Sequence, residues 1–335
     1  MNEVLRANLL SPFPLSFALG AFARSIRSDL RIPKEAYQIL SVYLLLALGL
    51  KGGVELGHAR LGDIVAPAGA TLLLGILTPL FAWAVLRLSR RFPPADCAAI
   101  AAHYGSVSAV TFFAAQQFVG LMGAPAEPFM TTLLTLLESP GIHVALAIGV
   151  LTRRPADAAL GSGGPEKGRT GQANWKSALH EILAGRTLML LVGGLLVGLV
   201  IGQAGYEPIR PFFEGGFKGA LVIFLLEMGM VAADRAGDLR SVGLFLGIFA
   251  IAVPLVHGGL GVLLGHAAGL SVGGCTILGA MAASASYIAA PPATLATLPE
   301  ANPSLSLTAS LGITFPFNLV VGIPAYFQFA QWVAR

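Results

Sequence analysis

The sequence predicts an all-α integral membrane protein, with ten transmembrane helices in two inverted five-helix repeats whose broken helices meet near the bilayer midplane. Three observations lead to this class: the composition, ten long apolar segments, and an internal repeat. Of the 335 residues, 55% are hydrophobic and 11% are charged, whereas a soluble domain carries about 25% charged residues. The formal net charge of +4 does not indicate nucleic-acid binding, because the basic residues lie mostly at helix ends, where orientation signals and lipid contacts explain them.

Ten apolar segments reach roughly the 20 residues that an α-helix needs to cross a bilayer. The segment from Arg153 to Glu181 differs from them, because it is rich in glycine and charge, which is typical of a linker. We therefore divide the chain into a first five-helix repeat at residues 1–152, a linker at 153–183 and a second repeat at 184–335. The predicted spans lie near residues 8–26, 36–54, 62–90, 95–121, 127–152, 184–204, 214–233, 239–269, 272–297 and 305–332.

An internal repeat supports this division, because similar short sequences occur in the same order in both halves. LLLALGLKGG at residues 44–53 aligns without gaps with FLLEMGMVAA at 224–233, and further on Ser106–Ser108 falls on Ser284–Ser286. Since five spans is an odd number, the second half enters the membrane the opposite way up. That is an inverted-topology repeat, the layout of many secondary transporters.

The distribution of basic residues predicts the orientation. Most lysines and arginines fall in the loops that follow the odd-numbered spans, and far fewer fall on the other side. The positive-inside rule places the richer side in the cytoplasm. We therefore expect a multi-pass protein of the bacterial inner membrane, with both termini outside the cytoplasm and the linker inside it.

Each half carries a Ser-x-Ser doublet inside an apolar segment, and these doublets are the main candidates for a functional site. Ser106–Ser108 and Ser284–Ser286 are both surrounded by small residues, and a double proline at 291–292 follows the second. Proline removes a backbone donor and clashes with the preceding turn, so we expect the later helix to break there. In hydrocarbon, irregular backbone survives only where it lines a cavity or is buried in protein. Two matching breaks therefore indicate a transporter binding site.

A broken helix exposes unpaired N–H groups at the start of its second half, and the helix dipole adds partial positive charge there, which attracts a small anion. Serine hydroxyls add donors and acceptors, and freed carbonyls can hold a cation such as Na⁺. The alternative is that the small residues only let helices pack closely. The candidate substrate-binding residues are Gly105, Ser106, Ser108, Ser284, Ser286 and Ile288.

Glu138 is the main candidate for binding a coupling ion. It lies in LLESPG inside the fifth predicted span, and a carboxylate at membrane depth is costly unless it has a partner or a cavity. The alternative is a structural hydrogen bond to a neighbouring helix. We expect no cofactor besides Na⁺ as the coupling ion, because the sequence contains no metal-ligand spacing. The candidate ion-binding residues are Thr111, Glu138, Thr314 and Asn318.

From the ninth span onward the sequence resembles the cyanobacterial sodium-dependent bicarbonate transporter family. That family has a serine-rich break, a Gly-Pro-Pro element and an ANPS turn, and the counterparts here are Ser284–Ser286, the double proline at 291–292 and residues 301–304. GSVSAVT at 105–111 is similar to the matching break of the first half. The chain departs from the family at Tyr287, which stands where the family has an acidic residue.

The resemblance implies two inverted five-helix repeats, a homotrimer that imports bicarbonate with Na⁺, and a PII-like regulatory protein on the cytoplasmic side. We therefore expect a secondary active transporter, with sodium-dependent bicarbonate symport by alternating access as the first choice. The alternatives are a transporter of another small anion, such as an organic carboxylate, and a membrane receptor that moves nothing. An intramembrane hydrolase using a serine and His103 is disfavoured, because no clear serine–histidine pairing is evident in the sequence, so we expect no enzyme.

Overall fold

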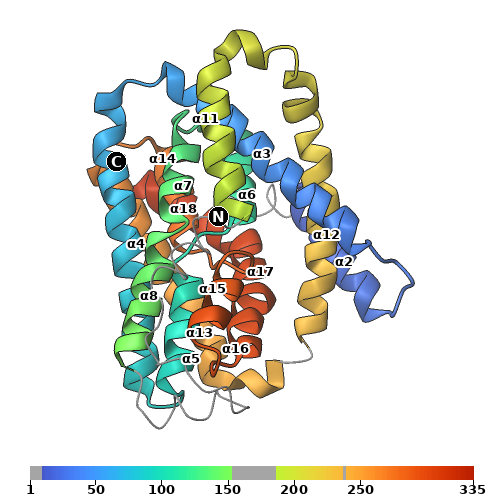
Figure 1. Ribbon diagram of the computed structural model, residues 1–335, viewed down its shortest axis with the longest axis vertical. Coiled ribbons are helices and arrows are strands. Elements are labelled where there is room, and N and C mark those ends of the chain that lie inside the picture. Colours follow the sequence, from blue (N-terminus) through green and yellow to red (C-terminus); the bar gives the residue numbers. More distant parts are fainter. Residues whose placement is uncertain (1–9, 153–185, 237–238) are drawn as a thin grey trace, which may run out of the picture.

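The computed structural model describes residues 10–152, 186–236 and 239–335. Within these ranges every regular element is a helix (Figure 1). Helices satisfy all their backbone hydrogen bonds within one segment, which is what a chain in hydrocarbon requires. The predicted linker at 153–183 lies outside the described residues.

Eight helices in the described part of the chain are long and apolar enough to cross a membrane, so the chain is a multi-pass membrane protein. The expected spans at 8–26 and 272–297 are not among them. The first corresponds to α2 (Pro12–Ser25), a helix of 14 residues, and the second begins with α14 (Val272–Ala282), a helix of 11 residues. The eight lie at Glu35–His58, Gly62–Ser89, Pro94–Leu121, Met130–Leu151, Met189–Tyr206, Pro211–Asp234, Gly243–Ala267 and Pro303–Val333.

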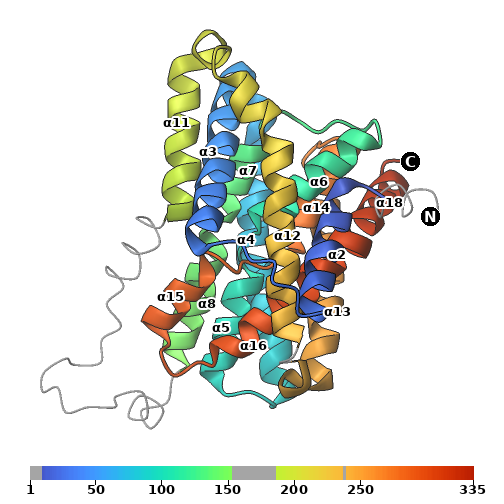
Figure 2. The ribbon, with the colours of Figure 1, turned by 90° about the vertical axis from the view of Figure 1, so that its right-hand side faces the viewer.

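Four helices form one side of the molecule, and we call them the four-helix bundle. Besides α2 it contains α3 (Lys34–His58), α11 (Arg186–Tyr206) and α12 (Phe217–Ala236), with the short π-helix η1 (Pro211–Gly215) before α12. Figure 2 looks onto this side, where α11 lies along α3 and α12 lies along α2. Each long contact therefore pairs a helix of the first half with a helix of the second.

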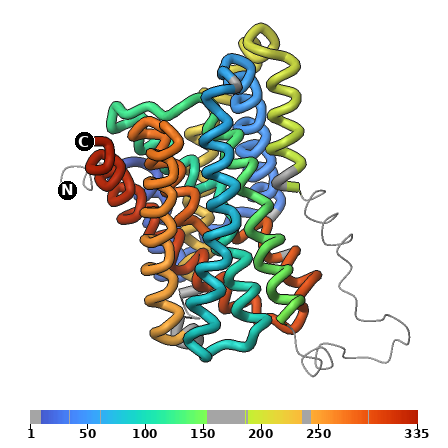
Figure 3. Tube along the Cα trace, turned by 90° about the vertical axis from the view of Figure 1, so that its left-hand side faces the viewer, coloured from blue at the N-terminus to red at the C-terminus, as the bar shows by residue number. Residues whose placement is uncertain are grey.

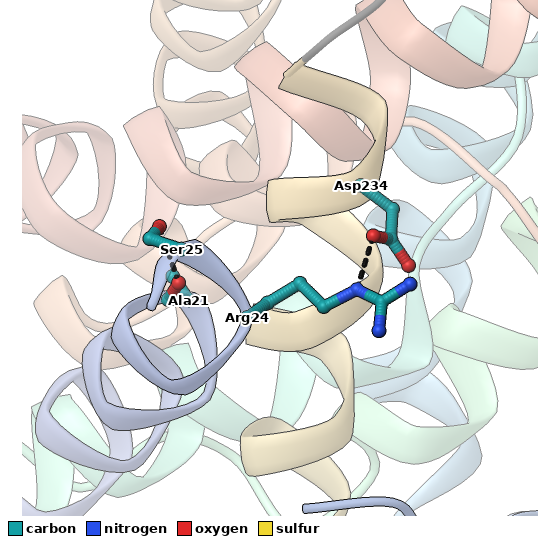
Figure 4. A network of polar contacts seen from close by, with 4 residues as sticks. All are labelled: Ala21, Arg24, Ser25 and Asp234. Atoms are coloured by element: carbon teal, nitrogen blue, oxygen red, sulfur yellow. Dashed lines mark hydrogen bonds and ion pairs between the residues drawn. The ribbon is translucent and has the colours of Figure 1, made fainter. Parts of the chain in front are cut away.

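Glycine allows the helices of this bundle to approach closely. Gly49 and Gly53 on α3 face Gly194 and Gly198 on α11, so near that a Cβ atom on any of the four would touch the other backbone. Small residues four apart are the usual interface of packed membrane helices. At one end of the bundle Arg24 on α2 forms an ion pair with Asp234 on α12 (Figure 4).

The remaining helices form the broken-helix bundle, which Figure 3 shows from its outer face. Its longest members are α4 (Leu61–Ser89) and α13 (Leu239–Ala267), at 29 residues each. The other members are α5 (Pro94–Tyr104), α6 (Ala109–Leu121), α7 (Met130–Leu137), α8 (Pro140–Leu151), α14, α15 (Ala290–Thr297), α16 (Pro303–Leu307), η2 (Thr308–Thr314), α17 (Phe315–Phe317), η3 (Asn318–Gly322) and α18 (Ile323–Val333).

The same pairings occur twice in this bundle. In the first half α4 packs against α5 and α8, and α5 packs against α8; in the second half α13 packs against α14 and α18, and α14 against α18. The most enclosed span is Pro94–Leu121, whose apolar window is 100% buried inside the protein. Cys97 and Cys275 are both free and buried.

Apolar side chains and small residues fill the boundary between the two bundles. Phe17 on α2 meets Phe315 edge-on at 5.5 Å between ring centroids, and Phe113 on α6 meets Phe217 on α12 at 4.5 Å. Gly52 on α3 packs against the side chain of Thr131 on α7. These contacts are made by dispersion and burial, without directional partners.

Candidate functional site

The first break lies between α5, which ends at Tyr104, and α6, which begins at Ala109. Ser108 is the N-cap of α6, and its Oγ accepts a hydrogen bond from the Thr111 amide at 3.2 Å. This is the ordinary role of serine before a helix, because its oxygen satisfies one of the first free N–H groups. Gly105 packs against Pro79 and the backbone of α8 so tightly that a Cβ atom would clash. Its position is therefore explained by close packing.

The second break lies between α14, which ends at Ala282, and α15, which begins at Ala290. The Ser286 Oγ accepts hydrogen bonds from the Ala289 and Ala290 amides at 3.2 Å and 3.4 Å. We expected the double proline to break the helix, and that placement was wrong. The prolines lie in the first turn of α15, where their missing N–H groups need no partner and their fixed φ suits a helix start.

The two breaks touch, and two hydrogen bonds join them. The Ser108 amide donates to the Ser284 Oγ at 2.8 Å, and the Ser286 amide donates to the His103 carbonyl at 2.8 Å. All four doublet serines are at most 5% exposed. Two serine doublets that are far apart in the sequence therefore form one buried polar centre, as the sequence predicted.

The hydroxyl protons of the four serines differ in availability. A serine hydroxyl has one proton to donate. Ser106 donates its proton to the Glu138 carbonyl at 2.8 Å, and Ser284 donates to the Met281 carbonyl at 2.7 Å. The Oγ atoms of Ser108 and Ser286 instead accept amide hydrogen bonds, so their own protons remain available to a ligand.

Tyr287 adds a third hydroxyl to the same centre. Its ring packs edge-on against Phe315 at 5.7 Å between centroids, and its hydroxyl lies beside the Ser108 side chain. Among the described residues this buried hydroxyl has no hydrogen-bond partner of ordinary geometry. Ile288 follows it in the break and is partly buried. A neutral donor thus lies where an acidic group would repel an anion.

The helices that follow the two breaks differ in the amides of their first turns. Within the described residues no protein acceptor meets the amides of Ala109 and Val110 in the first turn of α6, as is usual at a helix start. The first turn of α15 contains two prolines, which have no N–H, and its Ala290 amide donates to Ser286. Of these two first turns, that of α6 therefore presents free amides to the centre, together with the positive end of the helix dipole.

Glu138 lies between α7 and α8, next to the first break. Its carbonyl accepts the Ser106 proton, and its side chain is only 4% exposed. Within the described part of the chain its buried Oε2 atom has no hydrogen-bond partner. A buried carboxylate oxygen without a partner is costly unless a cation or a proton joins it, so this position suits a cation that arrives from outside the chain.

The other candidate ion ligands differ in how far their polar atoms are engaged. Thr111 is buried in the first turn of α6, beside Ser108. The Thr314 Oγ1 donates to the Ala250 carbonyl at 2.7 Å and contacts the Tyr104 hydroxyl at 2.6 Å, so Tyr104 must be the donor there. The side-chain amide of Asn318 donates to the Ala283 carbonyl at 2.8 Å. This hydrogen bond connects η3 to the second break. Thr314 and Asn318 therefore hold helices together in this conformation.

Two further hydroxyls were not singled out in the sequence. Ser306 and Thr308 are at most 1% exposed, and within the described residues their Oγ atoms have no partner. They lie at or just before the π-helix η2, and π-helical turns occur frequently at functional sites. The alternating hydroxyls of SLSLTAS were a signal that could have identified them.

Comparison with known proteins adds one result. The family model described as the Na⁺-dependent bicarbonate transporter superfamily matches residues 12–331. No curated protein matches the sequence.

Proposed function

Since the chain belongs to the Na⁺-dependent bicarbonate transporter superfamily, we propose that it is a secondary active transporter that imports bicarbonate together with Na⁺. The observation that carries this proposal is the contact between the two breaks, which brings buried donors without acceptors into one polar centre. Bicarbonate is a small oxyanion and needs donors from several directions. The Ser108 and Ser286 hydroxyls, with the free amides at the start of α6, supply such donors.

The coupling ion would bind beside the anion. The free carboxylate oxygen of Glu138 is the natural ligand for Na⁺, with Thr111 and carbonyls of the first break as neutral partners. Thr314 and Asn318 would become ligands of Na⁺ only in a conformation in which their present hydrogen bonds are broken. A cation at Glu138 would also attract the anion, so each ion would strengthen binding of the other.

We propose further that the two halves are inverted repeats and that transport occurs by alternating access. Support comes from the repeated pairings of α4, α5 and α8 in α13, α14 and α18, and from the reciprocal contacts of α2 with α12 and α3 with α11. The four-helix bundle and the broken-helix bundle would be the two moving parts. Each inter-helix hydrogen bond and ion pair named above joins members of the same bundle, which suits rigid-body motion.

The family also suggests a setting for the protein. We propose a homotrimer in the bacterial inner membrane, with both termini outside the cytoplasm and the linker at 153–183 inside it, where a PII-like regulator would bind. The basic residues of the sequence support this orientation. Lipid or a neighbouring subunit would cover the exposed apolar side chains of α11, such as Leu196 and Val200.

Another small anion, such as an organic carboxylate, is the closest alternative, because the donors described here would also hold a carboxylate. The test is uptake of radiolabelled bicarbonate into proteoliposomes, with and without an inward Na⁺ gradient. We expect uptake well above empty vesicles only with the gradient, and weak competition by unlabelled formate or acetate. Uptake of the organic anion in place of bicarbonate would assign the alternative. Specific binding of bicarbonate without flux would indicate a receptor.

A further inference from the structure

Figure 2 shows the end of the molecule that carries the α11–α12 connection. Two cavities are lined by residues of that connection and of the segments near it. One, of about 780 Å³, lies between α3, α6 and the segment from Arg210 to Lys218. The other, of about 640 Å³, lies between the α3–α4 connection, residues 127–129 and the end of α13. They share one face of the protein but differ in charge, which makes each a control for the other.

The larger cavity is rich in positive charge, and we call it the cationic cavity. Its lining includes Lys51, Arg210 and Lys218 but only one carboxylate, that of Glu214. Lys51 pairs with Glu214 at 3.4 Å and with Glu55 at 3.8 Å, and Arg210 pairs with Glu207 at 3.3 Å. Within the described residues Lys218 forms no ion pair, and it is exposed.

The smaller cavity has the opposite balance, and we call it the acidic cavity. Its charged lining residues are Arg60, Asp63 and Glu127, with His58 beside them. One Glu127 carboxylate oxygen accepts a hydrogen bond at 2.5 Å from the amide of Ser271, the residue directly before α14. An anion in solution would therefore be drawn to the cationic cavity rather than to its neighbour.

The cationic cavity lies against α6, the helix that begins at the first break. Gln116 and Gln117 of α6 line it, and the free amides of α6 begin at Ala109 on the same helix. Eight residues of α-helix span about 12 Å. The cavity also lies on the boundary between the two bundles, since α3 belongs to one and α6 to the other. That boundary is the one that alternating access would open.

We propose that the cationic cavity is the entry vestibule for the transported anion, a low-affinity site for small inorganic anions and carboxylates. Lys218 attracts the anion from solution, the ion pairs of Arg210 and Lys51 make the surrounding wall polar, and Gln116 and Gln117 provide uncharged donors on α6. This role rests on the proposed function for its direction of transport. The electrostatic part, an anion-concentrating cavity, rests on the charges alone.

The first test measures the potential inside the cavity without any transport. The buried thiols are removed by Cys97→Ala and Cys275→Ala, and Gln117→Cys places a reporter in the cationic cavity. Its reaction rates with an anionic sulfonatoethyl and a cationic trimethylammonium-ethyl methanethiosulfonate are compared with those of a free thiol. We expect a preference of about 10-fold for the anionic reagent, because a charged cleft concentrates counter-ions by that order.

Two further variants and a matched control sharpen this test. Lys218→Gln should lower the preference, and Glu214→Gln should raise it. Ala268→Cys, in the acidic cavity, should show no preference for the anionic reagent. Equal rates for the two reagents at position 117 would overturn the proposal, whether or not the protein transports bicarbonate.

The second test measures entry. In proteoliposomes Lys218→Gln should raise the KM for bicarbonate several-fold at low ionic strength and leave the maximal rate unchanged. The difference should disappear at high salt, where the screening length falls to about 3 Å. An unchanged KM in a variant that has lost the anionic preference would overturn the entry role. Failure of the wild-type protein to transport bicarbonate would instead count against the proposed function.

Discussion

The two breaks are built alike, but the helices that follow them differ in the hydrogen-bond donors of their first turns. In each, a serine Oγ accepts amide hydrogen bonds at the start of the following helix, Ser108 at α6 and Ser286 at α15. The first turn of α6 has free amides, whereas the first turn of α15 contains two prolines without N–H groups. The first turn of α6 can therefore supply main-chain donors for an anion, whereas α15 begins with residues that cannot donate. Similar sequence motifs at equivalent places in the two halves thus need not perform equivalent chemistry.

The second difference concerns the residues that flank the breaks. Glu138, beside the first break, has an unpartnered carboxylate oxygen within the described residues. Thr314, which precedes Pro316 by two positions as Glu138 precedes Pro140, has its proton engaged by Ala250. The first half would therefore bind both ions, the anion through the free amides of α6 and the cation through the free carboxylate oxygen of Glu138. The second half would fix the geometry. Four tests, some with a matched control variant, can break or sharpen this comparison, and they are taken from the largest expected effect to the smallest.

Glu138→Gln should have the largest effect. Loss of one member of a buried ion pair costs about 3–5 kcal/mol, so Na⁺-driven uptake should fall at least about 100-fold. The measurement is the initial rate of bicarbonate uptake as a function of Na⁺ concentration. A normal Na⁺ dependence in this variant would show that the cation binds elsewhere.

Ala109→Pro should come next, because it gives α6 the kind of first turn that α15 has. Proline suits this position, since it is the first of the helix and Ser108 before it is extended at φ −99° and ψ 113°. The variant loses one hydrogen bond to an anion, about 2 kcal/mol, or roughly 30-fold in the KM for bicarbonate.

The control for this variant is Pro291→Ala, which adds an amide to α15. In our account, bicarbonate binding does not depend on an amide at position 291, because the native proline has none. The KM for bicarbonate should therefore change little. Equal effects of the two variants would contradict the asymmetry between the breaks. Thermal unfolding in detergent would check that both proteins are folded.

Ser286→Ala and Ser106→Ala form a matched pair with a smaller effect. Each removes a buried hydroxyl, so each should lower the melting temperature by a similar amount. Of these two serines, Ser286 has a free proton for the anion and Ser106 does not. Ser286→Ala alone of the pair should therefore raise the KM for bicarbonate, by about 10-fold for a hydrogen bond of roughly 1.5 kcal/mol. A larger effect of Ser106→Ala on the KM would show that the donors are assigned wrongly.

Thr314→Val should have the smallest effect on transport and a clear effect on stability. It removes the donor to Ala250 and the acceptor of Tyr104, and an unsatisfied buried group costs about 1–3 kcal/mol. The melting temperature should fall by several degrees, while the Na⁺ dependence of uptake should stay near that of the wild-type protein. Loss of Na⁺ dependence would place Thr314 among the ion ligands.

Much of the architecture could be predicted because membrane helices follow composition closely. The interruptions at Ser106–Ser108 and Ser284–Ser286 and their meeting were predictable, since irregular backbone at membrane depth must be buried in protein. The prolines at 291–292 were misplaced by several residues, because proline excludes a helix interior but not a helix start. A local rule could not decide which of the two applied.

The partners of individual polar groups could not be predicted. Thr314 bonds to Ala250, and Tyr104 reaches Thr314 from 210 positions away, so only the packed structure shows that Thr314 is satisfied. The cationic cavity is similar, because Lys51, Gln117 and Lys218 come from three helices that the sequence does not place together. Charge counts along loops predict orientation, and they do not show which charges share a cavity.

Density for the ligands themselves would test most directly whether a small anion binds where the two breaks meet. The measurement is a high-resolution cryo-electron microscopy map of the protein in bicarbonate and Na⁺, compared with one in their absence. We expect added density within hydrogen-bond distance of the Ala109 amide and the Ser286 hydroxyl, and a second feature at the Glu138 carboxylate. Identical maps around the breaks, or anion density bound only elsewhere in the protein, would contradict this account.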